Sequence, residues 1–120
     1  MNLTDKQKDT IDKIKKVAEI TGMNASWLCA VAFVESSLGI HQKSPTGCRG
    51  VYQMSGIAMK DLLIEMENSN DDWADILCGI AFLKLLLKRH KTIEHATSHF
   101  CEPNDRHFYI DRVIKAMGEF

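Results

Sequence analysis

The chain has 120 residues, 45% of them hydrophobic and 26% charged, with a formal net charge of −1. This length suits one compact domain and is too short for two, so we expect a single domain over residues 1–120. The near-neutral charge argues against electrostatic capture of nucleic acid or of an acidic membrane, and only two prolines and seven glycines argue against a loop-rich β fold.

An amphipathic helix is predicted over residues 5–21. Thr4 and Gln7 fit a capping box ahead of it, and Gly22 supplies a stop. Apolar side chains recur at three- and four-residue spacing along one face: Ile11, Ile14, Val17, Ala18 and Ile20 or Thr21. The first nine residues are polar and mixed in charge, so they do not resemble a signal peptide.

A buried helix is predicted from the unbroken apolar run 27–34, which ends at Glu35. Periodicity alone would also allow a strand, but Ala30 and Ala32 favour a helix, with Ser26 as its N-cap. Glu35 would then lie partly out of water, and burial would raise its pKa. A carboxyl group that is still protonated near neutral pH can serve as a general acid. The equally weighted alternative is a glutamate paired with a Lys or Arg at the core edge.

Four further helices are predicted after a turn region. Residues 39–50 carry turn chemistry, and residues 51–54 form a short ordered piece, either extended or a single turn. The helices span about residues 56–67, 73–89, 92–99 and 105–117. Gly79, inside the second of them, indicates that another backbone approaches closely there. The prediction is an all-α fold of five or six helices with little or no sheet.

The last predicted helix is expected to bury the side chains Phe108, Ile110 or Tyr109, Val113 and Ile114. The longest strongly apolar run, residues 76–87, is broken by Gly79 and Lys84. It is too short to cross a membrane.

The four cysteines lie far apart in the sequence: Cys29, Cys48, Cys78 and Cys101. No CxxC-type metal knuckle exists, and we interpret the cysteines as reduced, buried thiols, although the even count leaves disulfides open. His95 and His99 would share a helix face near Cys101 and could hold zinc. No further ligand has a regular spacing, so we expect no metal.

The segment from Glu35 to Met54 carries a specific combination of residues. It has the form E-S-x7-S-P-x-G-x2-G-x2-Q-M, made by Ser36, Ser44, Pro45, Gly47, Gly50, Gln53 and Met54. This resembles the first motif of the soluble lytic transglycosylase (SLT) domain of the lysozyme-like superfamily. Residues 75–83 resemble the second motif of that family, Asn-Ile-x-x-Gly-x-x-Tyr-Leu, with Phe82 in place of the Tyr, and residues 108–113 resemble its closing Tyr-Val segment. The resemblance covers roughly residues 20–117.

One stretch departs from the family pattern. The third motif of the family is Ala-x-Tyr-Asn-x-Gly, and the corresponding residues are 96–103. When Pro103 is aligned with the proline that often follows the Gly of the family, His99 takes the place of the Tyr. Histidine titrates near neutral pH and tyrosine does not, so the proton chemistry on this side of a cleft would differ.

The resemblance implies cleavage of the β-1,4 bond between N-acetylmuramic acid and N-acetylglucosamine in peptidoglycan, without metal or cofactor. Glu35 would act first as an acid on the leaving oxygen and then as a base on the sugar's 6-hydroxyl, closing a 1,6-anhydro ring. An ordinary glycosidase needs a second carboxylate roughly 5–9.5 Å away, and residues 36–54 contain no Asp or Glu. Lysozyme-type hydrolysis of the same bond and a non-catalytic glycan-binding module stay open as alternatives.

The remaining candidate residues divide into two groups. The substrate-binding candidates are Ser44, Gln53, Tyr52, His99 and Tyr109. The first two could instead open a turn and satisfy loop backbone, Tyr52 could belong to the core, and His99 could lie on the surface. The residues expected to have structural roles near the site are Ser36, Gly47, Gly50 and Met54. Ser36 would close the helix end and steady the Glu35 backbone.

The expected partner is a peptidoglycan glycan strand, bound by a monomer. This substrate lies outside the cytoplasmic membrane, yet the chain shows no export signal. We therefore expect an enzyme of the periplasm or cell wall that is released by a phage, carried in a virion or delivered by a secretion machine. Virion or secretion-machine proteins would then be further partners. A domain excised from a longer protein is the other explanation.

Overall fold

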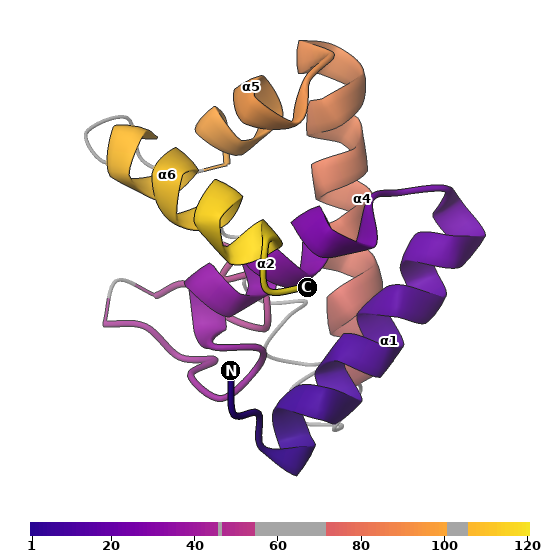
Figure 1. Cartoon of the computed structure of the whole chain (residues 1–120), viewed down its shortest axis with the longest axis vertical. Coiled ribbons are helices and arrows are strands. Elements are labelled where there is room, and N and C mark those ends of the chain that lie inside the picture. The colour runs from indigo at the N-terminus through magenta and orange to yellow at the C-terminus, as the bar shows by residue number, and fades with distance from the viewer. Residues whose placement is uncertain (46, 55–71, 101–105) are drawn as a thin grey trace.

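The computed structural model describes residues 1–45, 47–54, 72–100 and 106–120. These residues form five α-helices and no sheet, which confirms the predicted all-α class (Figure 1). The helices are α1 (Asp5–Thr21), α2 (Ala25–Ser36), α4 (Asp72–His90), α5 (Ile93–Ser98) and α6 (Arg106–Met117). The helix predicted over residues 56–67 lies outside the described residues.

Helix α1 has the ends that its sequence predicted. The Thr4 hydroxyl accepts the Gln7 N–H at 3.1 Å, and Gln7 Oε1 accepts the Thr4 N–H at 2.9 Å, which completes the capping box. Gly22 ends the helix in the left-handed conformation, at φ 70°. The predicted apolar face is buried, except that Ile20 is 84% exposed.

Helix α2 is the buried helix, and it lies between α1 and α6 (Figure 1). Its residues from Trp27 to Ala32 are fully buried. The N-cap is Asn24, whose side chain accepts the Trp27 N–H at 3.0 Å, so the prediction of Ser26 is wrong. Asn24 sits three residues before that donor, the spacing at which a cap side chain reaches an unpaired helix N–H.

Helices α4 and α5 pack against each other, and α4 also contacts α1 while α5 also contacts α6. The Trp27 indole N–H donates to the Thr97 hydroxyl at 2.9 Å, and both side chains are fully buried. At the other end of α4, Asp72 forms salt bridges with Lys6 at 2.9 Å and Lys13 at 3.6 Å. These contacts fix α4 and α5 relative to the two N-terminal helices.

Helix α6 turns a different face inward from the one its sequence predicted. Tyr109, Val113 and Ala116 are buried, whereas Phe108 is 77% exposed and Ile114 is 40% exposed. The buried residues are spaced by four and three, so they form one face of the helix that packs on α2. Phe108 and Ile114 each lie one residue away from that face, which is why the predicted core set is partly wrong.

Among the described helices, none combines the length and the apolar character that a membrane crossing requires.

Candidate active site

Glu35 lies in the last turn of α2, directly after the apolar run 27–34. The residue itself is only partly exposed, and Ser36 beyond it is 1% exposed. Burial raises the pKa of the Glu35 carboxyl from its ordinary value of 4.5 to about 7. The raised pKa that the apolar run predicted is therefore present. Glu35 forms no salt bridge with a described residue, so the alternative of a closely paired carboxylate does not hold for this part of the chain.

Two side chains of α6 act on Glu35 in the opposite direction. A hydrogen bond from Tyr109 and the positive charge of Arg112 both favour the carboxylate and so lower the pKa of Glu35. The two residues are three apart, so they lie on neighbouring positions of one helix face. Desolvation outweighs both effects, which leaves a carboxyl group that can give up or hold a proton near neutral pH.

The turn after α2 has an unusual backbone. Ser37, Leu38 and Gly39 all have positive φ, at 53°, 58° and 89°. This conformation suits Gly39 but is strained for the other two, and such residues cost on the order of 1–3 kcal/mol each. Leu38 is fully buried, and its burial offsets part of that strain. Strained backbone held in place by packing is typical of functional sites, and here it directly follows Glu35 and Ser36.

Hydrogen bonds from two side chains hold this turn. The Ser36 hydroxyl donates to the Val51 carbonyl at 2.6 Å and accepts the Gly39 N–H at 2.9 Å, which is the structural role expected of Ser36. Gln7 Nε2 donates to the Ser37 carbonyl at 3.1 Å, while its Oε1 caps α1. The buried Gln7 side chain thus joins the start of α1 to the end of the helix that carries Glu35.

The loop after this turn uses its polar side chains to satisfy its own backbone. The Ser44 hydroxyl accepts the Cys48 N–H at 3.0 Å, and Gln53 Nε2 donates to the Gly50 carbonyl at 2.8 Å. Gly47 and Gly50 adopt positive φ, at 89° and 86°, as tight turns require. Contacts of Ser44 and Gln53 with a sugar stay predictions.

Met54 is 6% exposed and pairs with Arg49 through two backbone hydrogen bonds, of 3.1 Å and 2.9 Å. This pairing is an isolated bridge, so residues 51–54 form a turn rather than a strand. Met54 therefore has the structural role that the sequence assigned to it.

Tyr52 belongs to the core, so of its two predicted positions the core is confirmed and the cleft is wrong. Its side chain is fully buried, and its hydroxyl donates to the Leu28 carbonyl at 3.0 Å. Its ring packs directly on Gly79 of α4, where any Cβ would collide with ring atoms. The close approach predicted at Gly79 therefore exists, but it is made by a tyrosine ring rather than by a backbone.

Asp75 fastens the loop to α4. Its Oδ2 accepts the Val51 N–H at 3.0 Å, and a Cβ on Gly50 would lie 2.5 Å from its Oδ1. Gly50 is therefore needed for the close approach of this carboxylate as well as for its positive φ. Asp75 occupies the position of the Asn in the second motif of the resemblance.

His99 lies on the surface at the end of α5. It is exposed, and its ring stacks on that of His90, the last residue of α4, with centroids 3.7 Å apart and planes 9° apart. Partial burial and the charges of His99, Arg89 and His95 lower the pKa of His90. This ring contact joins His99 to α4 and not to α2, so a role of His99 in binding substrate stays a prediction.

The other candidate zinc ligand, Cys101, lies outside the described residues. Within the described residues, no group of three His, Cys, Asp or Glu side chains could hold a metal ion. Cys29, Cys48 and Cys78 form no disulfide with one another, and burial raises the pKa of Cys29 to about 11.

Sequence patterns gave no site role to Gln7, Asp75 or Arg112. The capping box already accounted for Gln7, so nothing in the sequence pointed to its second contact with Ser37. The resemblance placed Asp75 in a motif without assigning it a partner. For Arg112 the only available signal was its spacing of three residues from Tyr109.

Comparisons of the chain with family models, with characterised proteins and with solved structures give no match. The chemistry of the site follows from Glu35 and its neighbours. The Glu35 carboxyl can donate a proton near neutral pH, and no carboxylate of a described residue contributes to its pKa.

Proposed function

We propose that this chain cleaves the β-1,4 bond between N-acetylmuramic acid and N-acetylglucosamine in peptidoglycan, with Glu35 as the only catalytic carboxyl group. The observation that carries the proposal is the position of Glu35, half-buried at the end of a core helix with a pKa of about 7. A general acid works best when its pKa lies near the working pH. The resemblance of residues 35–54 to the SLT domain supports the choice of substrate.

The proton of Glu35 passes to the oxygen of the leaving sugar as the glycosidic bond breaks. The carbonyl oxygen of the substrate's own N-acetyl group bonds to the sugar carbon, so a second protein carboxylate is not required. Glu35, now a carboxylate, removes the proton of the 6-hydroxyl as that oxygen displaces the acetamido oxygen. The products are a 1,6-anhydro-muramic end and the re-protonated Glu35.

The Tyr109 hydrogen bond and the Arg112 charge suit the second half of this cycle. Both stabilise the carboxylate form of Glu35. The desolvated niche stabilises the protonated form, so the two forms lie close in free energy at neutral pH. A group that acts alternately as acid and base benefits from such a balance.

Mass spectrometry of the fragments released from purified cell walls tests this proposal. We expect fragments that end in 1,6-anhydro-N-acetylmuramic acid, and no release by the Glu35→Gln variant. Release of reducing ends instead would show lysozyme-type hydrolysis. Binding to walls without release of fragments would show a glycan-binding module. Release that persists in Glu35→Gln would refute the assignment of Glu35.

The proposed substrate sets the proposed location, which is the periplasm or cell wall. Phage release, transport in a virion, delivery by a secretion machine or origin in a longer protein would each bring the chain to that substrate. A chain that acts alone on purified walls needs no virion or secretion-machine partner for catalysis, so the same wall assay tests the monomeric enzyme.

A further inference from the structure

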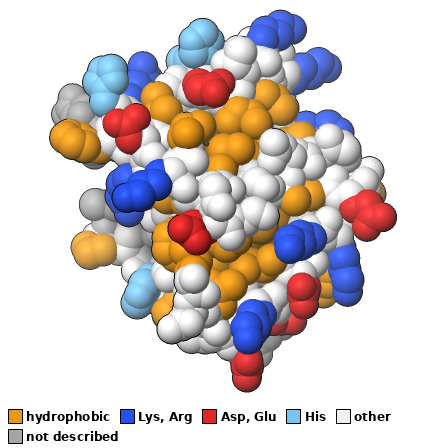
Figure 2. All heavy atoms as spheres, viewed as in Figure 1, with side chains coloured by type: hydrophobic (Ala, Val, Ile, Leu, Met, Phe, Trp, Pro, Cys, Tyr) orange, Lys and Arg blue, Asp and Glu red, His pale blue; other side chains and the backbone are white. Residues whose placement is uncertain are grey.

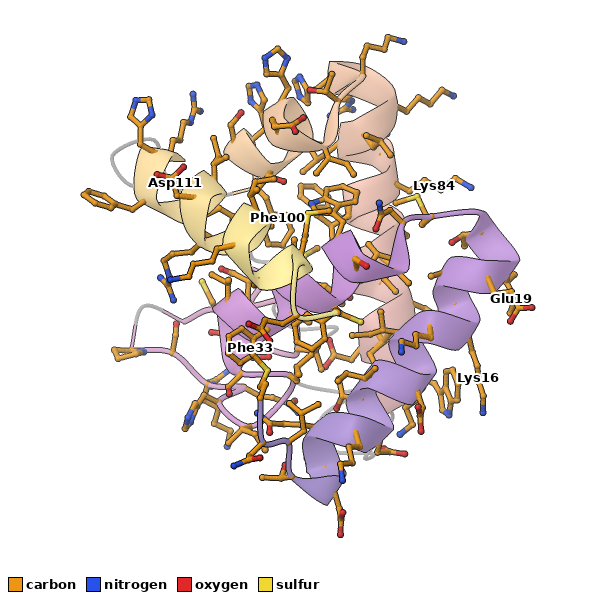
Figure 3. All side chains as sticks on the ribbon, viewed as in Figure 1. Lys16, Glu19, Phe33, Lys84, Phe100 and Asp111 are labelled. Carbon is orange, nitrogen blue, oxygen red and sulfur yellow. The ribbon has the colours of Figure 1, made fainter. Side chains whose placement is uncertain are left out.

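A pocket of about 240 Å³ opens beside the catalytic helix, between the end of α2 and the C-terminal half of α6. Its apolar lining comes from Met1, Phe33, Val34 and Ala116. Figure 3 shows Phe33 below the C-terminal end of α6, and Figure 2 shows hydrophobic side chains exposed on this face with charged side chains at their edges. Arg112 lines the pocket and its charge also acts on the Glu35 carboxyl, so the pocket is close to the proposed reaction site.

The charged side chains of the lining are Arg112, Lys115 and Glu119, which together carry one excess positive charge. Neither of the two cations forms a salt bridge with a described residue, whereas Lys6 and Lys13 of α1 do. A carboxylate that entered the pocket would therefore meet two cationic groups that no described carboxylate holds in a salt bridge, although the charge of Arg112 also acts on Glu35. Charge-assisted hydrogen bonds of this kind are stronger than neutral ones.

The lining does not suit a sugar ring. The seven side chains that line the pocket include no hydroxyl or amide group, and these are the groups that usually pair with sugar hydroxyls. The volume is also below the roughly 300–1,000 Å³ of pockets that enclose a whole drug-sized ligand. A short branch with small apolar groups and a carboxylate fits both the size and the chemistry.

We propose that this pocket binds the peptide branch of peptidoglycan through a carboxylate held by Arg112 and Lys115, so that the enzyme prefers glycan strands that carry peptide. This rests on the proposed function. Peptide branches on muramic acid begin with a small apolar residue followed by an acidic one, so a strand bound at Glu35 presents a methyl group and a carboxylate nearby.

Arg112 connects the pocket with the reaction site. It lines the pocket, and its charge also acts on the Glu35 carboxyl together with the hydrogen bond from Tyr109. A branch carboxylate held by Arg112 would offset that positive charge, so the bound branch would help Glu35 to keep its proton. Arg112 variants would therefore change two properties at once, and Lys115 is the cleaner position for a test.

The first experiment measures binding without catalysis. Full-length Glu35→Gln protein is titrated with acetyl-L-Ala-D-Glu, and separately with the bis-amide of that dipeptide, while NMR follows the backbone amides of Val34 and Ala116. We expect shifts with the acid only, and about five-fold weaker binding when Lys115→Gln is added. Lys88→Gln, at an exposed position near the end of α4, is the matched control and should change nothing. Equal shifts with both probes, or none, would overturn the proposal.

The second experiment compares intact walls with walls whose peptides have been removed by an amidase. Lys115→Gln should lower the rate on intact walls about five-fold and leave the rate on peptide-free strands unchanged, with an unchanged melting temperature. An equal loss on both substrates would overturn the proposal. If the wild-type protein cleaves neither substrate, the proposed function fails, and the peptide titration still decides whether the pocket binds a carboxylate.

Discussion

Glu35 must be protonated to begin the proposed cycle, and this requirement sets the pH dependence of activity. The pKa of its carboxyl is about 7 because burial disfavours the charged form. We expect kcat/KM for wall cleavage to fall about ten-fold per pH unit well above pH 7, measured by dye release from labelled walls. Activity that stays constant up to pH 9 would contradict the assignment of Glu35 as the acid.

Tyr109 influences this pH profile because its hydrogen bond lowers the pKa of Glu35. That bond favours the carboxylate, so Tyr109→Phe should raise the pKa of Glu35 further and move the falling limb to higher pH. The ring, which is 7% exposed, keeps its packing in this variant. If Tyr109→Phe raises KM and the fall of activity at high pH stays at the same pH, Tyr109 would instead be a substrate contact, which is the role that the sequence assigned to it.

At the scale of elements, one side chain controls how the start of α1 holds the end of α2. Gln7 accepts a hydrogen bond from the Thr4 N–H and donates one to the Ser37 carbonyl. Gln7→Glu keeps the acceptor but loses the donor at pH 7, so it should destabilise the fold by about 1–2 kcal/mol and lower activity. Urea denaturation measures the first effect and dye release the second.

Protonation provides the control for this variant. At about pH 3.5 a large share of the glutamic acid introduced at position 7 carries a proton that can be donated to Ser37. The difference from wild type should then shrink, whereas Gln7→Ala should remain less stable at both pH values. A Gln7→Glu variant as stable as wild type at pH 7 would show that the contact with Ser37 contributes nothing.

The contact between α4 and the loop can be tested through its smallest residue. A Cβ at Gly79 would collide with the Tyr52 ring, so Gly79→Ala should destabilise the protein by about 1–3 kcal/mol, measured by the urea midpoint. Gly118→Ala is the matched control, because its Cβ would lie 3.4 Å from the nearest atom, the Lys115 carbonyl oxygen. Equal stability of the two variants would mean that Tyr52 moves aside at no cost.

At the scale of the whole molecule, local signals predicted the helices well. The capping box and the periodic face defined α1, and the run 27–34 defined the buried α2. Such signals involve residues within a few positions of one another, so the sequence carries them directly. The buried face of α6 was predicted only in part, because apolar residues lie on several sides of this helix. Packing against α2 buries Tyr109 and Val113 and leaves Phe108 exposed.

The part of the candidate site that could be predicted from the sequence is Glu35, because its environment depends on neighbouring residues of the same helix. The position of Glu35 at the end of an apolar run was enough to predict its raised pKa. The contacts that hold it were not predictable, since Gln7 and Ser37 are 30 residues apart and Val51 and Asp75 are 24 apart. The position of Tyr52 was left open between a cleft and the core, because nothing local reveals that its ring packs on Gly79.

The raised pKa of Glu35 also predicts how the stability of the molecule depends on pH. The folded state binds a proton more tightly than the unfolded state, where the pKa is near 4.5. The stability linked to this proton is therefore fully present below about pH 4.5 and is lost as the pH rises through 7. A difference of about 2.5 pKa units corresponds to at most about 3 kcal/mol.

Glu35→Gln removes this loss, because the amide resembles the protonated acid and cannot ionise. We expect the variant to be more stable than wild type by up to about 3 kcal/mol at pH 8 and nearly equal at pH 4. Urea denaturation at both pH values measures the difference in free energy of unfolding between the two proteins. All other titrating groups, His90 included, are present in both proteins, so their contributions cancel in this difference. A variant less stable than wild type at pH 8 would show that the Glu35 carboxylate stabilises the fold. The pKa of Glu35 would then not be raised, and the proposed chemistry depends on that raised pKa.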